Sequence, residues 1–168
     1  VGAEWKSETD DDGATLIYNA SQFENLIVRG SSSESLTKYA LGANLDLCNI
    51  NMTPNDGLAG NTIFDGKNHT IFNVRRGETI ANYAAGSIYG YGDNVTVKDL
   101  TIDGMTIDYT ATVDSSNYYH AFGALAGFVG DGFTAEKVTV KNVTMNLNLL
   151  GEEGDAYTSA HLLPAESI

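Results

Sequence analysis

The sequence has few of the residues that staple a small fold or interrupt its strands. Its 168 residues include two prolines and one cysteine, Cys48. A single cysteine cannot form an internal disulfide, so the fold is not held covalently, and we expect Cys48 to be buried and unreactive. The sequence also lacks an apolar run of about 18 residues, so we expect no membrane-spanning helix.

Basic residues are scarce as well. Nine lysines and arginines stand against 22 acidic residues, which gives a net charge of −13. This balance argues against nucleic acids and anionic membranes as partners. The three histidines, His69, His120 and His161, are isolated and lack metal-ligand spacing, so we predict no metal site and no cofactor. What the sequence does have is 18 glycines and 42% hydrophobic residues, which suits one domain of short strands and turns.

The stretch from Val95 to Tyr109 carries the pattern on which the fold prediction depends. Its apolar residues alternate with threonine, lysine and aspartate, which places them on one face of a strand. The alternation slips at Asp99 and again at Asp103-Gly104, and these residue types tolerate the left-handed backbone of a sharp corner. Short strands joined by corners, all facing one axis, describe one turn of a parallel β-solenoid.

This stretch recurs along the chain. Residues 95–102 align with residues 138–145, and residues 70–74 align with residues 96–100. Repetition at intervals of about 20–50 residues is typical of stacked structural units. The sequence therefore predicts an all-β fold, a single-stranded parallel β-helix of about four turns.

The same alignment predicts a ladder of polar residues at one corner. It places Asn73, Asp99 and Asn142 at equivalent positions in three successive turns. Stacked side chains of this kind can satisfy the hydrogen-bonding groups of the turn backbone. We therefore interpret these three residues as structural.

A short helix is predicted at residues 21–28, ahead of the first strand. Ser21 and Glu24 have the spacing of a capping box, and apolar residues follow on one helical face. The open end of a solenoid exposes apolar core and unpaired strand edges, so such ends need a cap. We expect this helix to cover the N-terminal end.

Three regions are expected along the chain. Residues 1–20 form an N-terminal extension, residues 21–150 form the β-helix with its capping helix, and residues 151–168 form a tail or an incomplete cap. The tail is acidic and weakly patterned. We therefore expect the last turn, near residues 138–150, to pack against a partner or a further length of chain.

Two segments indicate a family. Residues 86–91 and 123–128 both read Gly-x-Ile/Leu-x-Gly-Tyr/Phe, and each precedes a strand with an Asn or Asp corner. This arrangement resembles the GLUG-type repeats of bacterial surface β-helix proteins over about residues 20–150. The resemblance implies a right-handed, pectate-lyase-like but non-catalytic β-helix, secreted or on the outer-membrane surface, as in adhesin-like proteins and lipoproteins.

β-Helices also include lyases and glycoside hydrolases, whose catalytic residues include carboxylates. Asp99, Asp103 and Asp108 are the candidates, but a glycosidase requires a correctly spaced pair. Asp99 and Asp103 are explained by corners, and Asp108 faces outward without a partner carboxylate. A carbohydrate-active enzyme stays an alternative, as does a structural accessory subunit of a larger surface lipoprotein complex.

The leading prediction is a non-catalytic surface module that binds a glycan or a surface protein. Residues 111–121 read as a protruding loop that carries Tyr118, Tyr119 and His120. Tyr89 should point outward if its neighbour Ile88 points inward. Exposed aromatic rings stack on sugar rings, so these four residues are the predicted ligand-binding set.

Overall fold

The computed structural model describes residues 8–28, 34–50, 58–76, 84–85, 88–113, 119–151 and 157–161. Most of these residues lie in strands. The strands are, in chain order, β1 (Thr15–Ile17), β2 (Thr37–Leu41), β3 (Leu45–Asp46), β4 (Leu58–Asp65), β5 (Thr70–Arg76), β6 (Ala84–Ala85), β7 (Tyr89–Val113), β8 (Tyr119–Gly123), β9 (Ala126–Val129), β10 (Thr134–Gly151) and β11 (Tyr157–His161).

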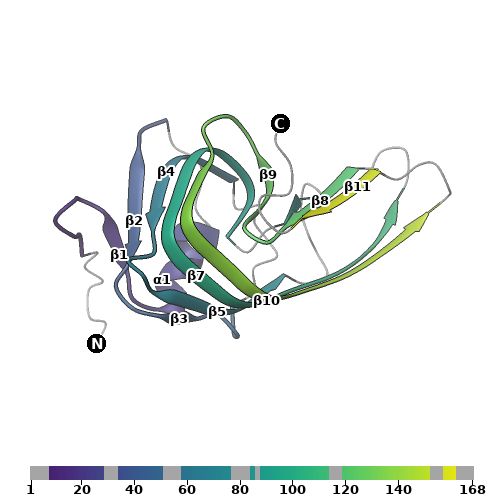
Figure 1. The fold of residues 1–168 in the computed structure, drawn as a ribbon, viewed down its shortest axis with the longest axis horizontal. Helices are drawn as coiled ribbons and strands as arrows, with labels where there is room; N and C mark the ends of the chain where they lie inside the picture. The colour runs from purple at the N-terminus through teal and green to yellow at the C-terminus, as the bar shows by residue number, and fades with distance from the viewer. Residues whose placement is uncertain are drawn as a thin grey trace.

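The named strands pair in parallel throughout. One sheet has the order β1-β2-β4-β7-β5-β3, with β9 and β10 also paired to β7, and a second sheet has the order β11-β8-β6. The larger sheet curls into a half-barrel (Figure 1). The fold is therefore all-β and parallel, and it is solenoid-like in part, because each pass of the chain lies beside the previous pass.

The bends of the sheet fall at residues with left-handed backbone. On β7 these residues are Asn94, Asp99 and Gly104, and on β10 they are Gly132, Lys137 and Asn142 just before and within the strand. In both strands they recur at every fifth position. Asparagine, aspartate and glycine adopt positive φ most readily, which explains their choice at most of these corners.

Between corners, each straight segment turns two apolar side chains inward and a threonine outward. The inward residues of β7 are at most 1% exposed: Val95, Val97, Leu100, Ile102, Met105 and Ile107. The outward threonines of β7 pair with threonines of β10: Thr96 with Thr134, Thr101 with Thr139, and Thr106 with Thr144. The core therefore consists of stacked aliphatic rows on the concave side of the sheet.

A short helix closes the concave side, as α1 (Ala20–Phe23) followed by a π-helical turn, η1 (Glu24–Val28) (Figure 1). Phe23 is fully buried and meets the Phe64 ring edge-on, with centroids 6.2 Å apart. The predicted cap at Ser21 is wrong. Asn19 is the N-cap and accepts a hydrogen bond of 2.9 Å from the Gln22 amide. Gln22 in turn accepts from the Tyr18 amide, so a reciprocal cap forms two residues earlier than predicted.

The predicted corner ladder is also wrong in its register. Thr70 pairs with Thr101 rather than Thr96, and Val138 pairs with Leu100 rather than Val95. Both alignments are displaced by five residues, which is the distance between successive corners. Each five-residue side repeats a corner, an apolar residue, a polar residue, a second apolar residue and a second polar residue. The sequence therefore cannot distinguish one side of the turn from the next.

Two further expectations, the burial of Cys48 and the loop at residues 111–121, differ from the structure. Cys48 is exposed rather than buried, because it follows the buried Leu47 at a bend after β3 and points to the other side. In the predicted loop at residues 111–121, residues 111–113 and 119–121 are strand, and residues 114–118 lie outside the described residues. β7 extends to Val113 and β8 begins at Tyr119.

The last pass of the chain differs from the earlier ones in its exposure. The inward apolar residues of β10 are half-buried, and Leu150 is 52% exposed. Among the described residues, the edge of β10 opposite β7 pairs with no further strand. In the region predicted as a tail, β11 pairs with β8. No helix in the described part of the chain is long and apolar enough to cross a membrane.

Replacement of Asn19 by alanine should lower the free energy of unfolding by about 1 kcal/mol, because the first helical turn loses the oxygen that accepts from the Gln22 amide. The matched Ser21→Ala change should cost less than about 0.5 kcal/mol, since Ser21 is exposed and is not the cap. Urea denaturation of both variants measures the difference. A larger loss in Ser21→Ala would restore the cap position predicted from the sequence.

Replacement of Gly66 by alanine should lower the free energy of unfolding by about 3 kcal/mol. An added Cβ would collide with the backbone oxygen of Asp99 and with Leu100, and backbone atoms cannot move aside as a side-chain tip can. Gly13→Ala is the control, because Gly13 has φ of +79° but open space around it. That change should cost about 1 kcal/mol for backbone strain alone. Equal losses, measured by thermal or urea unfolding, would contradict the close packing of successive passes at Gly66.

Candidate functional site

Tyr89 does not point outward as predicted. Its side chain is 3% exposed, and its neighbour Ile88 is 1% exposed. The expectation failed because Ile88 lies before β7 begins, where the alternation of a strand does not apply. Burial raises the pKa of the Tyr89 phenol well above its ordinary value. A ring with this burial is not accessible for stacking on a sugar.

For the other three residues of the predicted ligand-binding set, the structure describes no side chain. Tyr118 and the side chains of Tyr119 and His120 lie outside the described residues. The backbone of Tyr119 and His120 belongs to β8, where the two residues pair with Tyr157 and Thr158 of β11.

The three predicted corner residues all have left-handed backbone, with φ of 58° at Asn73, 50° at Asp99 and 56° at Asn142. They do not form one column. Asn73 and Asn142 both lie opposite Gly104, and Asp99 lies opposite Lys137.

The corner amides instead bond to the carboxylates that precede the neighbouring corners. Asn73 donates to Asp46 at 3.1 Å, and Asn142 donates to Asp103 at 2.7 Å. The bond from Asn73 lowers the pKa of the Asp46 carboxyl. These carboxylates and amides therefore link successive passes of the chain.

A second polar ladder was missed by the sequence reasoning. The side chain of Asn94 donates to that of Asn61 at 2.5 Å, and both residues have left-handed backbone. The recurrence of Asn or Asp at every fifth position was the signal that could have located this corner.

A cluster of charged side chains surrounds Asp65 on β4. Lys67 lies 3.6 Å and Lys98 3.8 Å from its carboxylate, and Lys67 also reaches Asp10 at 3.4 Å. The Ala14 amide hydrogen bond holds the pKa of Asp10 below its ordinary value. Because each carboxylate has a cationic neighbour, this cluster is explained by its role in fastening the N-terminal segment to the sheet.

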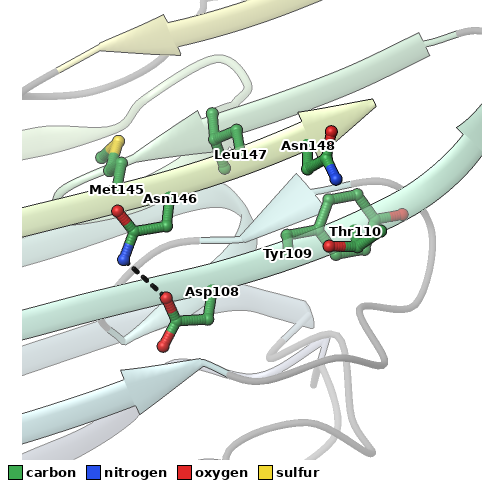
Figure 2. A pocket seen from close by; sticks show the side chains of 7 residues that line it. All are labelled: Asp108, Tyr109, Thr110, Met145, Asn146, Leu147 and Asn148. Atoms are coloured by element: carbon green, nitrogen blue, oxygen red, sulfur yellow. Dashed lines mark hydrogen bonds between the residues drawn. The ribbon is translucent and has the colours of Figure 1, made fainter. Parts of the chain in front are cut away.

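A hollow of about 510 Å³ lies on the ribbon formed by β7 and β10 (Figure 2). Its lining residues come from one stretch of each strand: Asp108, Tyr109, Thr110, Met145, Asn146, Leu147 and Asn148. The volume falls within the range of about 300–1,000 Å³ that is typical of small-molecule sites. β5 ends its pairing with β7 at Ile107, so this stretch lies where the two strands run on together beyond the curled sheet (Figure 1).

The pairing of the two strands brings four polar side chains onto one face of this ribbon. Asn146 lies opposite Asp108, and Asn148 lies opposite Thr110. In a parallel sheet, such positions are about 4.8 Å apart across the strands and about 6.6 Å apart along them. Asn146 points from β10 toward β7 and donates to Asp108 at 2.7 Å, whereas Met145 and Leu147 point to the other side of β10 (Figure 2).

This polar quartet, defined as Asp108, Thr110, Asn146 and Asn148, offers several hydrogen-bond donors and acceptors with a single negative charge. Thr110, Asn146 and Asn148 are exposed, and Asp108 is half-buried. Asp108 was predicted to face outward beside Thr106 and Thr110. Its neighbours Asn146 and Asn148 were not predicted, because they lie on another strand and Asn146 is 38 residues further along the chain. The quartet can bind a polyhydroxylated ligand, and it lacks the second carboxylate that hydrolysis of a glycoside requires.

Among the residues that the structure describes, no group of histidine, cysteine, aspartate and glutamate could hold a metal ion. Comparisons found no family model, no curated protein and no solved structure that matches this chain.

Proposed function

We propose that the chain is a non-catalytic carbohydrate-binding module built on a right-handed parallel β-helix. The observation that carries this proposal is the polar quartet in the hollow on β7 and β10. Sugar hydroxyls both donate and accept hydrogen bonds, and amide, hydroxyl and carboxylate groups complement them. Parallel pairing along the whole of β10 holds the backbone of the quartet in place, so little order has to be imposed on binding.

A binding role is favoured over catalysis by the number of carboxylates. Asp108 is the one carboxylate among the residues that line the hollow. The nearest outward carboxylate on the same strand, Asp103, is occupied by Lys141 and Asn142. A secreted or bacterial cell-surface location and a GLUG-type relationship are part of this proposal, and the acidic composition is compatible with them.

The test is a screen of neutral and charged oligosaccharides by calorimetry or a glycan array. Asn146→Ala and Asn148→Ala should each weaken binding about tenfold, since each removes an amide that can hydrogen-bond the ligand. Thr139→Ala is the matched control, because Thr139 is exposed on the same strand but outside the hollow. Failure of every saccharide to bind, or equal weakening by the control, would contradict the proposal.

A second candidate function is assembly through the open edge of β10. The inward aliphatic row is at most 1% exposed on β7 but only partly buried on β10. An unpaired edge of a long strand is a template for another strand. β10 carries Lys137 and Lys141 against Glu136, so charge repulsion at this edge is small although the whole chain carries −13. We propose a second copy of the chain as the occupant.

Sedimentation velocity over a range of concentrations tests this second candidate. The parent should form dimers, and Val140→Lys should make it monomeric, because Val140 is an inward, half-buried residue on the open edge. Thr139→Lys should leave the dimer intact, since the adjacent Thr139 faces outward. A parent that stays monomeric at all concentrations, or a dimer unaffected by Val140→Lys, would exclude assembly of this kind.

A further inference from the structure

The carboxylate of Asp108 has different neighbours from those of Asp65 and Asp103, although Asp46, like Asp108, accepts from a neutral amide. Asp65 lies within 4 Å of two lysines, with distances of 3.6 Å to Lys67 and 3.8 Å to Lys98. Asp103 lies 3.7 Å from Lys141. Asp108 has no cationic partner in the described part of the chain, and its hydrogen bond comes from a neutral amide, that of Asn146.

The surroundings of Asp108 do not neutralise its charge by other means. The lining of the hollow consists otherwise of amide, hydroxyl and apolar groups. The whole chain carries −13, so long-range attraction favours a cationic ligand over an anionic one. A half-buried carboxylate feels a nearby charge more strongly than a fully hydrated one, because water screens it less. An uncompensated negative charge in a hollow is complementary to a cationic ligand group.

From this we infer that the ligand of the hollow is an amino sugar, whose protonated ammonium group pairs with Asp108 while its hydroxyl groups bond to Thr110, Asn146 and Asn148. This inference rests on the proposed carbohydrate-binding function and specifies its ligand class. The same charge disfavours uronic acids, because a sugar carboxylate would lie against Asp108 without an intervening cation.

Two ligands that differ in one group test the inference. Oligomers of β-1,4-linked glucosamine and of β-1,4-linked glucose share their linkage and differ in the substituent at carbon 2. At about pH 5, where the amine of glucosamine is protonated, the parent should bind the glucosamine oligomer about tenfold more tightly. That preference corresponds to about 1.4 kcal/mol, and it should fall as the salt concentration rises. An oligogalacturonate should bind more weakly than either.

Two isosteric variants locate the source of the preference. Asp108→Asn removes the charge but keeps an oxygen for the Asn146 amide, so it should bind both oligomers with equal affinity. Asp103→Asn is the matched control, because Asp103 is already paired with Lys141 and lies outside the hollow. This control should keep the tenfold preference. Circular dichroism of both variants checks that the fold is unchanged.

The outcomes separate this inference from the function on which it rests. If the parent binds no oligosaccharide at all, the proposed function fails. If the parent binds both oligomers equally, or if Asp108→Asn keeps the preference, binding of sugars stands but the assignment of an amino sugar to Asp108 is overturned. A loss of preference in Asp103→Asn would also overturn it, because the effect would then be a property of the general surface charge.

Discussion

The fold depends on one backbone constraint, the left-handed residue at every fifth position of β7 and β10. Each such residue bends the chain without breaking its pairing with the neighbouring pass. The straight segments between them can then present two apolar side chains to the same interior. Stacking of these segments in parallel buries complete aliphatic rows, and each fully buried side chain contributes about 1.5–3 kcal/mol against the entropy lost on ordering. The rest of the core is arranged around these rows.

The corners also decide which polar residues are available for binding. At each corner, polar groups are drawn into contacts between successive passes, such as Asn73 with Asp46 and Asn142 with Asp103. These groups stabilise the bends. Beyond the last corner of β7, at Gly104, the strand runs straight and its outward residues have no corner to support. The polar quartet lies in this segment, where Asp108 and Asn146 bond to each other across the two strands and no corner follows them.

The two ends of the stack of strands differ in how far they are covered by other parts of the described chain. On the N-terminal side, Phe23 of α1 fills the concave face against Phe64, so the first passes are covered. On the other side, the row on β10 has neighbours from β7 alone among the described strands. The hollow and the proposed edge interface both lie on β10, and Met145 and Leu147 of its inward row also line the hollow. Outward side chains line the polar face of the hollow, whereas inward side chains and free backbone groups form the edge.

Much of the fold was determined by the sequence, since alternation and phase slips are local properties of the chain. They predicted parallel strands and corners at Asp99 and Gly104. A capping-box pattern and a helical apolar face predicted the short helix that follows β1. Three features were decided by tertiary structure. The first was the register of pairing between neighbouring strands. One five-residue side has the same pattern as the next, so only packing selects which sides lie next to each other. The second was the burial of Tyr89, because the direction of its side chain depends on where β7 begins. The third was the polar quartet, which pairs Asp108 with Asn146 across 38 residues of chain. No local pattern records which residue of one pass lies beside which residue of the next.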